Sequence, residues 1–240
     1  RRETDMARRS VPAGMTQGEK IRGGCLLAVY FAALPLAADP MFDLLEKWLR
    51  IALGEAVRNA AYYYILFALT LIAFWGWLGR AVRAALDRPG GFFLTVGVGL
   101  VAVYGLNEIV FRVFQIFSIG QENLNDQTIL ARIGSAPRST ILILVFLAPI
   151  VEEAVFRGYI FGNLRELSRP AAYLVSCFLF AFIHVWQFVA VHRDFSYLLV
   201  MVQYFVPGAV MAWTFERSGS IWGSILLHCA VNGLAVWSIL

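Results

Sequence analysis

The chain has 240 residues, of which 60% are hydrophobic and only 15% are charged. Soluble domains are nearer half apolar and a quarter charged, so this composition predicts a polytopic membrane protein. It excludes a disordered chain, a collagen-like chain and a disulfide-rich scaffold. Much of the formal net charge of +4 lies in the N-terminal segment and the connecting loops, which predicts the lipid bilayer, with its anionic headgroups, as a partner and no nucleic acid.

The first 57 residues combine basic, apolar and amphipathic segments. Residues 1–24 are rich in Arg and Lys and lack apolar periodicity, which predicts a basic cytoplasmic tail, with a cleaved signal peptide as the alternative. The short apolar run 25–38 predicts the first membrane span. Residues 44–57 mix apolar and charged positions at helical spacing, which predicts an amphipathic helix lying along the membrane interface.

Further along the chain, long apolar segments are separated by short polar connections. Apolar runs at 60–79 and 92–117 predict the second and third spans, and a polar loop is expected at 120–138. Four more spans are predicted in close succession, at 139–164, 171–191, 195–215 and 220–240. The expected fold is an all-α polytopic transmembrane helical bundle with about seven spans and one interfacial amphipathic helix.

This pattern divides the chain into a basic tail at 1–24, N-terminal helices at 25–138 and a core at 139–240 that carries the polar motifs described next. Lys and Arg are more frequent in the loops on the side of the N-terminus than in the alternate loops. By the positive-inside tendency, the N-terminus is therefore expected in the cytoplasm. We expect an integral, multi-pass protein of a bacterial inner membrane.

Titratable and polar side chains occur where the bilayer should disfavour them. A charge near the bilayer centre costs about 2.5–3.5 kcal/mol on insertion scales, so such residues call for a functional explanation. Counted along each predicted helix from its cytoplasmic end, those of three spans fall in one layer of the membrane. They are Glu152, Glu153 and Arg157 in the fourth span, His184 in the fifth, and His228 and Asn232 in the seventh.

Helical spacing separates these residues by role. Glu153 and Arg157 are four residues apart and should neutralise each other, whereas Glu152 has no local partner. A carboxylate beside an imidazole can take a proton from water as a carbonyl is attacked. An imidazole and a carboxamide on one helix face, as in His228 and Asn232, can stabilise the resulting oxyanion. The set suits amide hydrolysis.

Two further features of the sequence bear on this region. Pro149, three residues before Glu152, lacks an amide hydrogen and is expected to kink the fourth span and free a backbone carbonyl. Glu108 and Arg112 in the third span form a second Glu–Arg pair at a four-residue interval, for which a structural role is expected.

The segments Glu152-Glu153-x-x-x-Arg157, Phe180-x-x-x-His184 and His228-x-x-x-Asn232 resemble the three signature motifs of the CPBP family. This family contains the type II CAAX prenyl endopeptidases and the bacteriocin-processing, or Abi, intramembrane proteases. The motifs occur in the family's order, and the resemblance covers residues 139–240.

The resemblance implies that Glu152 and His184 activate a water molecule and that His228 and Asn232 form an oxyanion hole, while Glu153 and Arg157 organise the site. It also implies an intramembrane endopeptidase that cleaves a membrane-associated or lipidated peptide or protein. The expected mechanism uses no cofactor and no metal.

Three alternatives remain open from the sequence. Two His and one Glu could form a zinc site with the same residues, although the chain has no HExxH motif. Buried carboxylates and imidazoles could also relay protons or bind a cation in a transporter. A non-catalytic scaffold that retains the fold is the third.

Overall fold

The computed structural model describes residues 14–117 and 123–238, and every regular element in these ranges is helical. Within them, six helices are long and apolar enough to cross a membrane, and a shorter apolar helix follows at Ile221–Trp237. The predicted class, an all-α polytopic bundle, is confirmed. The chain is a multi-pass integral membrane protein.

The N-terminal part of the bundle consists of three long helices. The first runs without a break from Gln17 to Leu49, and Thr16 begins it with a capping box to Glu19. It comprises α1 (Gln17–Ala28), the π-helical segment η1 (Val29–Ala33) and α2 (Leu34–Leu49). The other two helices are α3 (Glu55–Asp87) and α4 (Pro89–Ile116).

The C-terminal part contains a short helix and four apolar ones. The short helix is α5 (Leu124–Ser135). The next helix runs through α6 (Pro137–Leu142), η2 (Ile143–Leu147), α7 (Ala148–Glu153), η3 (Ala154–Phe161) and α8 (Gly162–Arg165), of which η2 and η3 are π-helical. The remaining elements are α9 (Arg169–His192), the 3₁₀ turn η4 (Phe195–Val200), α10 (Met201–Ser218) and α11 (Ile221–Trp237).

Two of the π-helical segments end shortly before a proline. Segment η1 ends two residues before Pro35, and η2 ends two residues before Pro149. A proline ring clashes with the carbonyl one turn earlier, and widening the helix by one residue relieves this clash. The expected irregularity at Pro149 is therefore a π-helical turn in the helix that carries Glu152.

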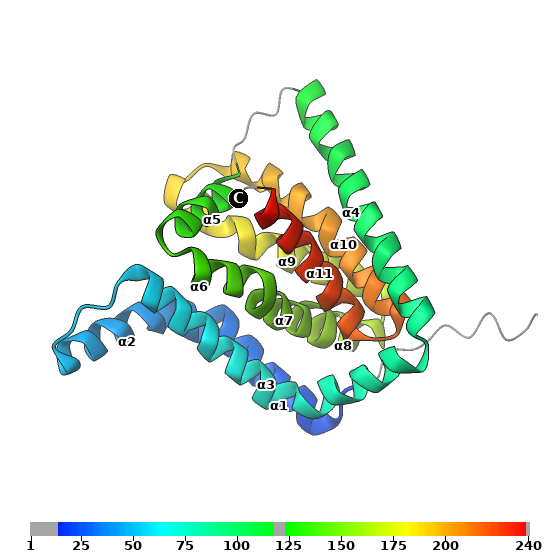
Figure 1. Ribbon diagram of the computed structural model, residues 1–240, viewed down its shortest axis with the longest axis horizontal. Coiled ribbons are helices and arrows are strands. Elements are labelled where there is room, and N and C mark those ends of the chain that lie inside the picture. Colours follow the sequence, from blue (N-terminus) through cyan, green and yellow to red (C-terminus); the bar gives the residue numbers. More distant parts are fainter. Residues whose placement is uncertain (1–13, 118–122, 239–240) are drawn as a thin grey trace, which may run out of the picture.

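The apolar core lies where α3, η3, α9, α10 and α11 meet, with α4 packed against α10 and α11 on one side (Figure 1). Helix α3 approaches η3 closely at Gly158. A Cβ atom at this position would overlap the ring of the buried Trp77. Glycine thus permits the contact that joins an N-terminal helix to the segment following Glu152.

Three boundary expectations differ from the structure. Residues 17–24 belong to α1 and not to a tail, and residues 1–13 lie outside the described part. No separate helix spans 44–57, because Arg50 adopts a left-handed conformation that ends α2, and α3 begins at Glu55 after Gly54. The segment 120–138, expected as a loop, contains α5, which the side chain of Asn123 caps.

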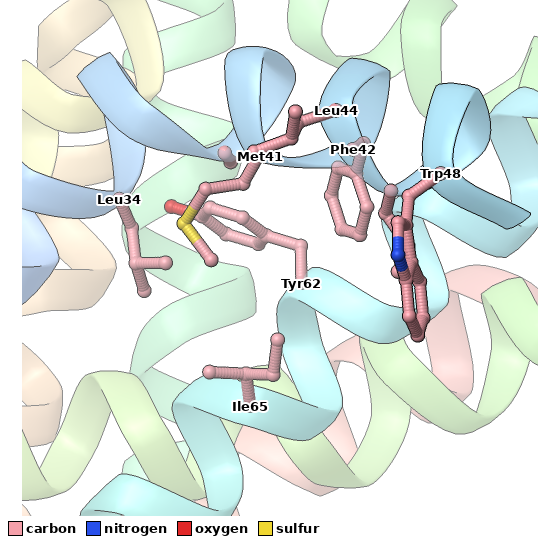
Figure 2. Close-up of a pocket in the computed structure, with 9 residues that line it drawn as sticks. Leu34, Met41, Phe42, Leu44, Trp48, Tyr62 and Ile65 are labelled. Carbon is pink, nitrogen blue, oxygen red and sulfur yellow. The ribbon is translucent and has the colours of Figure 1, made fainter.

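An apolar cavity of about 480 Å³ lies between α2 and α3 (Figure 2). Its lining contains no carboxylate, imidazole or amine, and its polar groups are the phenol of Tyr62 and the indole N–H of Trp48. The residues lining it are Leu34, Ala38, Met41, Phe42, Leu44, Leu45, Trp48, Tyr62 and Ile65.

Candidate active site

Glu152 lies at the centre of the buried polar cluster. Its Oε2 atom is 4.0 Å from Nε2 of His184 on α9 and 3.9 Å from Nε2 of His228 on α11. Three helices thus direct one carboxylate and two imidazoles toward one point. The exposed fractions of the side chains are 11% for Glu152, 17% for His184 and 6% for His228, so the cluster retains slight access from outside.

The second nitrogen of each imidazole has a fixed hydrogen-bond partner. Nδ1 of His184 lies 2.7 Å from the carbonyl of Phe180, and Nδ1 of His228 lies 2.9 Å from Oε1 of Glu153. A carbonyl and a carboxylate accept hydrogen bonds, so each Nδ1 carries a proton. In the neutral rings, the lone pair is therefore on Nε2, the ring atom that lies about 4 Å from Oε2 of Glu152 in each case.

Glu153 is fully buried and accepts hydrogen bonds from three side chains. Its Oε1 accepts from Arg157 Nη1 at 2.9 Å and from Nδ1 of His228, and its Oε2 accepts from the hydroxyl of Ser224. The pairing of Glu153 with Arg157 is the neutralisation expected from their spacing. The carboxylate also fixes the orientation of His228 through its hydrogen bond, an arrangement typical of imidazoles in functional sites.

Arg157 is held by contacts on two other helices. Its Nη2 donates to the carbonyl of Gly208 on α10 at 3.1 Å, and its guanidinium carbon lies 4.1 Å from the centre of the Phe180 ring on α9. A Cβ atom at Gly208 would come within 3.2 Å of Arg157 Nη2. The sequence Pro207-Gly208 thus allows α10 to approach the buried cation.

Asn232 contacts the backbone that Pro149 leaves without a donor. In the π-helical register, residue 148 donates to the carbonyl of residue 143, so residue 149 would donate to Leu144, but proline has no amide hydrogen. The Nδ2 atom of Asn232 donates to the Leu144 carbonyl at 2.9 Å. One N–H of this carboxamide remains for another acceptor.

The structure brings five of the six predicted residues into one connected cluster: Glu152, Glu153, Arg157, His184 and His228. Asn232 lies one turn from His228 on α11, and its amide is engaged by Leu144.

Three further groups contribute to the cluster and were not predicted from the sequence. Ser224 precedes His228 by four residues, and this spacing could have identified it. The Gly208 carbonyl and the ring of Tyr204, which stacks on His184 with 4.4 Å between the ring centres, come from a helix without a motif residue and had no such signal.

The fold and this cluster define a multi-pass membrane protein with a carboxylate and two imidazoles facing one another in its interior. Residues 134–234, which include all six predicted residues, match the family described as type II CAAX prenyl endopeptidase, Rce1-like. Over these residues the chain is similar to that family.

Two curated proteins illustrate the similarity. The protein named "Putative membrane peptidase YdiL" from Bacillus subtilis is 34% identical over 124 residues, which are 51% of this chain and 46% of that protein. The UPF0177 protein YxdF from Lactococcus lactis is 31% identical over 90 residues, or 38% of this chain and 44% of that protein. The chain thus spans about half the length of the curated relatives it matches. No solved structure matches it at a comparable level.

Proposed function

We propose that the protein is an intramembrane endopeptidase that hydrolyses a peptide bond in a membrane-associated or lipidated protein or peptide, with Glu152 activating the water. The family match and the name of the Bacillus relative support a peptidase of the CAAX type. We further propose a bacterial inner membrane as its location, with the N-terminus in the cytoplasm.

The observation that carries the proposal is the spacing around Glu152. Two acceptors that receive the two hydrogens of one water molecule lie about 4.4 Å apart when each hydrogen bond is about 2.8 Å long. The measured separations of 3.9 and 4.0 Å are close to this value and too long for direct hydrogen bonds. A water held between Glu152 and an Nε2 lone pair would keep its own lone pair free for attack.

In the proposed reaction, the water oxygen bonds to the carbonyl carbon as its proton passes to Glu152. The carbonyl oxygen becomes an oxyanion, which accepts from the remaining N–H of Asn232. Breakage of the C–N bond follows, with the proton returning from Glu152 to the leaving amine. His228 can donate from Nε2 only when its ring carries a second proton, while its Nδ1–H stays bonded to the carboxylate of Glu153.

Zinc remains a second candidate for the mechanism, because two imidazole nitrogens and a carboxylate are suitable ligands. Ligands of a tetrahedral zinc ion lie about 3.3 Å apart, so binding would draw these side chains closer than the distances observed. In the described ranges, no three His, Cys, Asp or Glu side chains already form a metal-binding group. Cleavage by purified protein in detergent with a strong chelator tests the point: retained activity supports the metal-free route, and activity lost and restored by zinc supports the metal.

The substrate can be sought without a prior guess of its identity. Membrane peptides from cells with the wild-type protein and from cells with Glu152→Gln are compared by mass spectrometry. The proposal predicts cleavage products that occur only with the wild type. Identical peptide profiles, combined with a loss of solute uptake in the variant, would favour a transporter in place of a peptidase.

A further inference from the structure

The imidazole of His184 is restrained on its ring face as well as through its Nδ1 atom. Its Nδ1 hydrogen bond to Phe180 stays within one helix turn of α9. The ring of Tyr204 on α10 lies nearly parallel to the imidazole, with 4.4 Å between the ring centres and 18° between the planes. The hydrogen bond fixes one ring atom, whereas the stack fixes the plane in which Nε2 points toward Glu152.

Tyr204 is itself held by the polar end of α5. Its hydroxyl donates to Oδ1 of Asn123 at 2.9 Å and accepts from Nδ2 of Asn125 at 3.1 Å. Asn123 also donates to Oε1 of Gln203 at 3.0 Å and caps α5 by accepting from the amide of Asp126. The segment before the fourth span is thereby joined to α10, some 80 residues later in the chain.

We infer that Tyr204 is a positioning residue for His184, and that the N-terminal end of α5 holds it in place. The inference rests on the proposed function, in which His184 and Glu152 share one water. A misplacement of about 1 Å in a reacting group can lower a rate about 10²-fold. A ring that could turn away from Tyr204 would move Nε2 by a comparable distance.

The nature of the residue supports a role beyond packing. Tyr204 is only half-buried, and apolar contact alone would be served by Phe or Leu at this position. Its hydroxyl instead has two amide partners on a helix that otherwise contacts α9 and α6. Because α5 holds the hydroxyl in place, the phenol ring stays stacked on the imidazole and restrains it.

Three variants separate the ring from its hydroxyl. Tyr204→Leu removes the stack, Tyr204→Phe keeps the ring and removes the hydrogen bonds, and Phe178→Leu is the control. Phe178 stacks on Phe182 of the same helix α9 with 13° between the planes, and its place six residues before His184 puts it on a different face of the helix. We expect Tyr204→Leu to lower kcat at least about 10-fold with KM changed less than about 2-fold, Tyr204→Phe to lie in between, and the control to match the wild type.

A second measurement does not depend on cleavage. Diethyl pyrocarbonate modifies accessible neutral imidazoles, and mass spectrometry distinguishes the three histidines, His184, His192 and His228. We expect His184 to react faster in Tyr204→Leu than in the wild type, with His192 as the internal reference. Unchanged reactivity of His184 in a folded Tyr204→Leu protein would overturn the inference. If Glu152→Gln still cleaved, the proposed function would fail, yet this measurement would still decide whether Tyr204 positions His184.

Discussion

Two Glu–Arg pairs with the same four-residue spacing lie in opposite surroundings. Glu153 and Arg157 in the core are both 0% exposed, whereas Glu108 and Arg112 near the end of α4 are 56% and 66% exposed. In both pairs the Arg nitrogen and the Glu oxygen form an ion pair, at 2.9 and 2.6 Å respectively. The difference lies in the neighbours: Glu153 also binds Ser224 and His228, and Arg157 also binds Gly208.

Burial decides what each pair contributes. An exposed pair near the end of a span, where water and salt reach it, gains little, and its two long side chains lose conformational freedom. A buried pair is costly to form, and the removal of one partner leaves an uncompensated charge. The core pair is therefore expected both to stabilise the fold and to orient His228, while the pair on α4 should have little effect on stability or on His228.

The largest effect is expected for Glu153→Gln compared with Glu108→Gln. The first leaves Arg157 buried without a counter-charge and should cost about 3–5 kcal/mol in free energy of unfolding; the second should cost no more than about 0.5 kcal/mol. Unfolding in mixed detergent micelles measures both. Equal losses of unfolding free energy in the two variants would contradict the different contributions assigned to the two pairs.

A double variant separates stability from orientation. Glu153→Gln with Arg157→Met removes both members of the pair and should recover much of the lost stability. Cleavage should stay lost, because Nδ1 of His228 no longer has a carboxylate to orient it. Restored cleavage in this variant would contradict the role assigned to Glu153.

Asn232 and Asn107 offer a second comparison, between two carboxamides. Asn232 contacts the Leu144 carbonyl beside the cluster, while Asn107 on α4 has an Oδ1 atom without a hydrogen-bond partner among the described residues. Asn232→Ala should lower kcat about 10²–10³-fold, as expected for loss of one oxyanion donor. Asn107→Ala is the matched control and should cleave at the wild-type rate.

Ser224→Ala tests the third partner of Glu153. Without the hydroxyl, a buried carboxylate oxygen loses its donor, which should cost about 1–3 kcal/mol in free energy of unfolding. Ser238→Ala, at the exposed end of the same helix, should have almost no effect. A Ser224→Ala protein as stable as the control would show that Oε2 of Glu153 finds another donor.

The smallest expected effect concerns an exposed charge with a capping role. Asp194 accepts from the amide and hydroxyl of Ser196 at 2.9 and 2.6 Å, and these hydrogen bonds hold the pKa of its carboxyl below the ordinary value. The folded state therefore binds this proton less readily, so the stabilisation is present above about pH 4 and is lost as the pH falls toward the lowered pKa. In Asp194→Asn, this part of the acid dependence of thermal unfolding should disappear.

The sequence predicted what depends on local spacing. Apolar runs located the spans, and the four-residue interval of Glu153 and Arg157 indicated their pairing. Ser224 could have been found in the same way. What could not be predicted depends on contacts between distant segments: Tyr204 receives its partners from α5, which was expected to be a loop.

The errors in the element boundaries have local causes that composition does not reveal. The left-handed conformation of Arg50 divides the segment expected to be an interfacial helix, and nothing in its charge pattern distinguishes a helix from a helical end followed by a turn. Likewise, the two Glu–Arg pairs have the same four-residue spacing, which does not by itself predict that one is buried and the other exposed. Only the packing of α9, α10 and α11 around η3 makes one of them a buried cluster.

The most direct measurement is the cleavage rate of purified Glu152→Gln beside the wild type, in detergent, on a substrate identified from the membrane peptides. Glutamine keeps the size of the side chain and cannot take a proton from water. We predict cleavage at the background rate with an unchanged thermal midpoint of unfolding. A folded variant that cleaves within about 10-fold of the wild-type rate would contradict the assignment of Glu152 as the group that activates water.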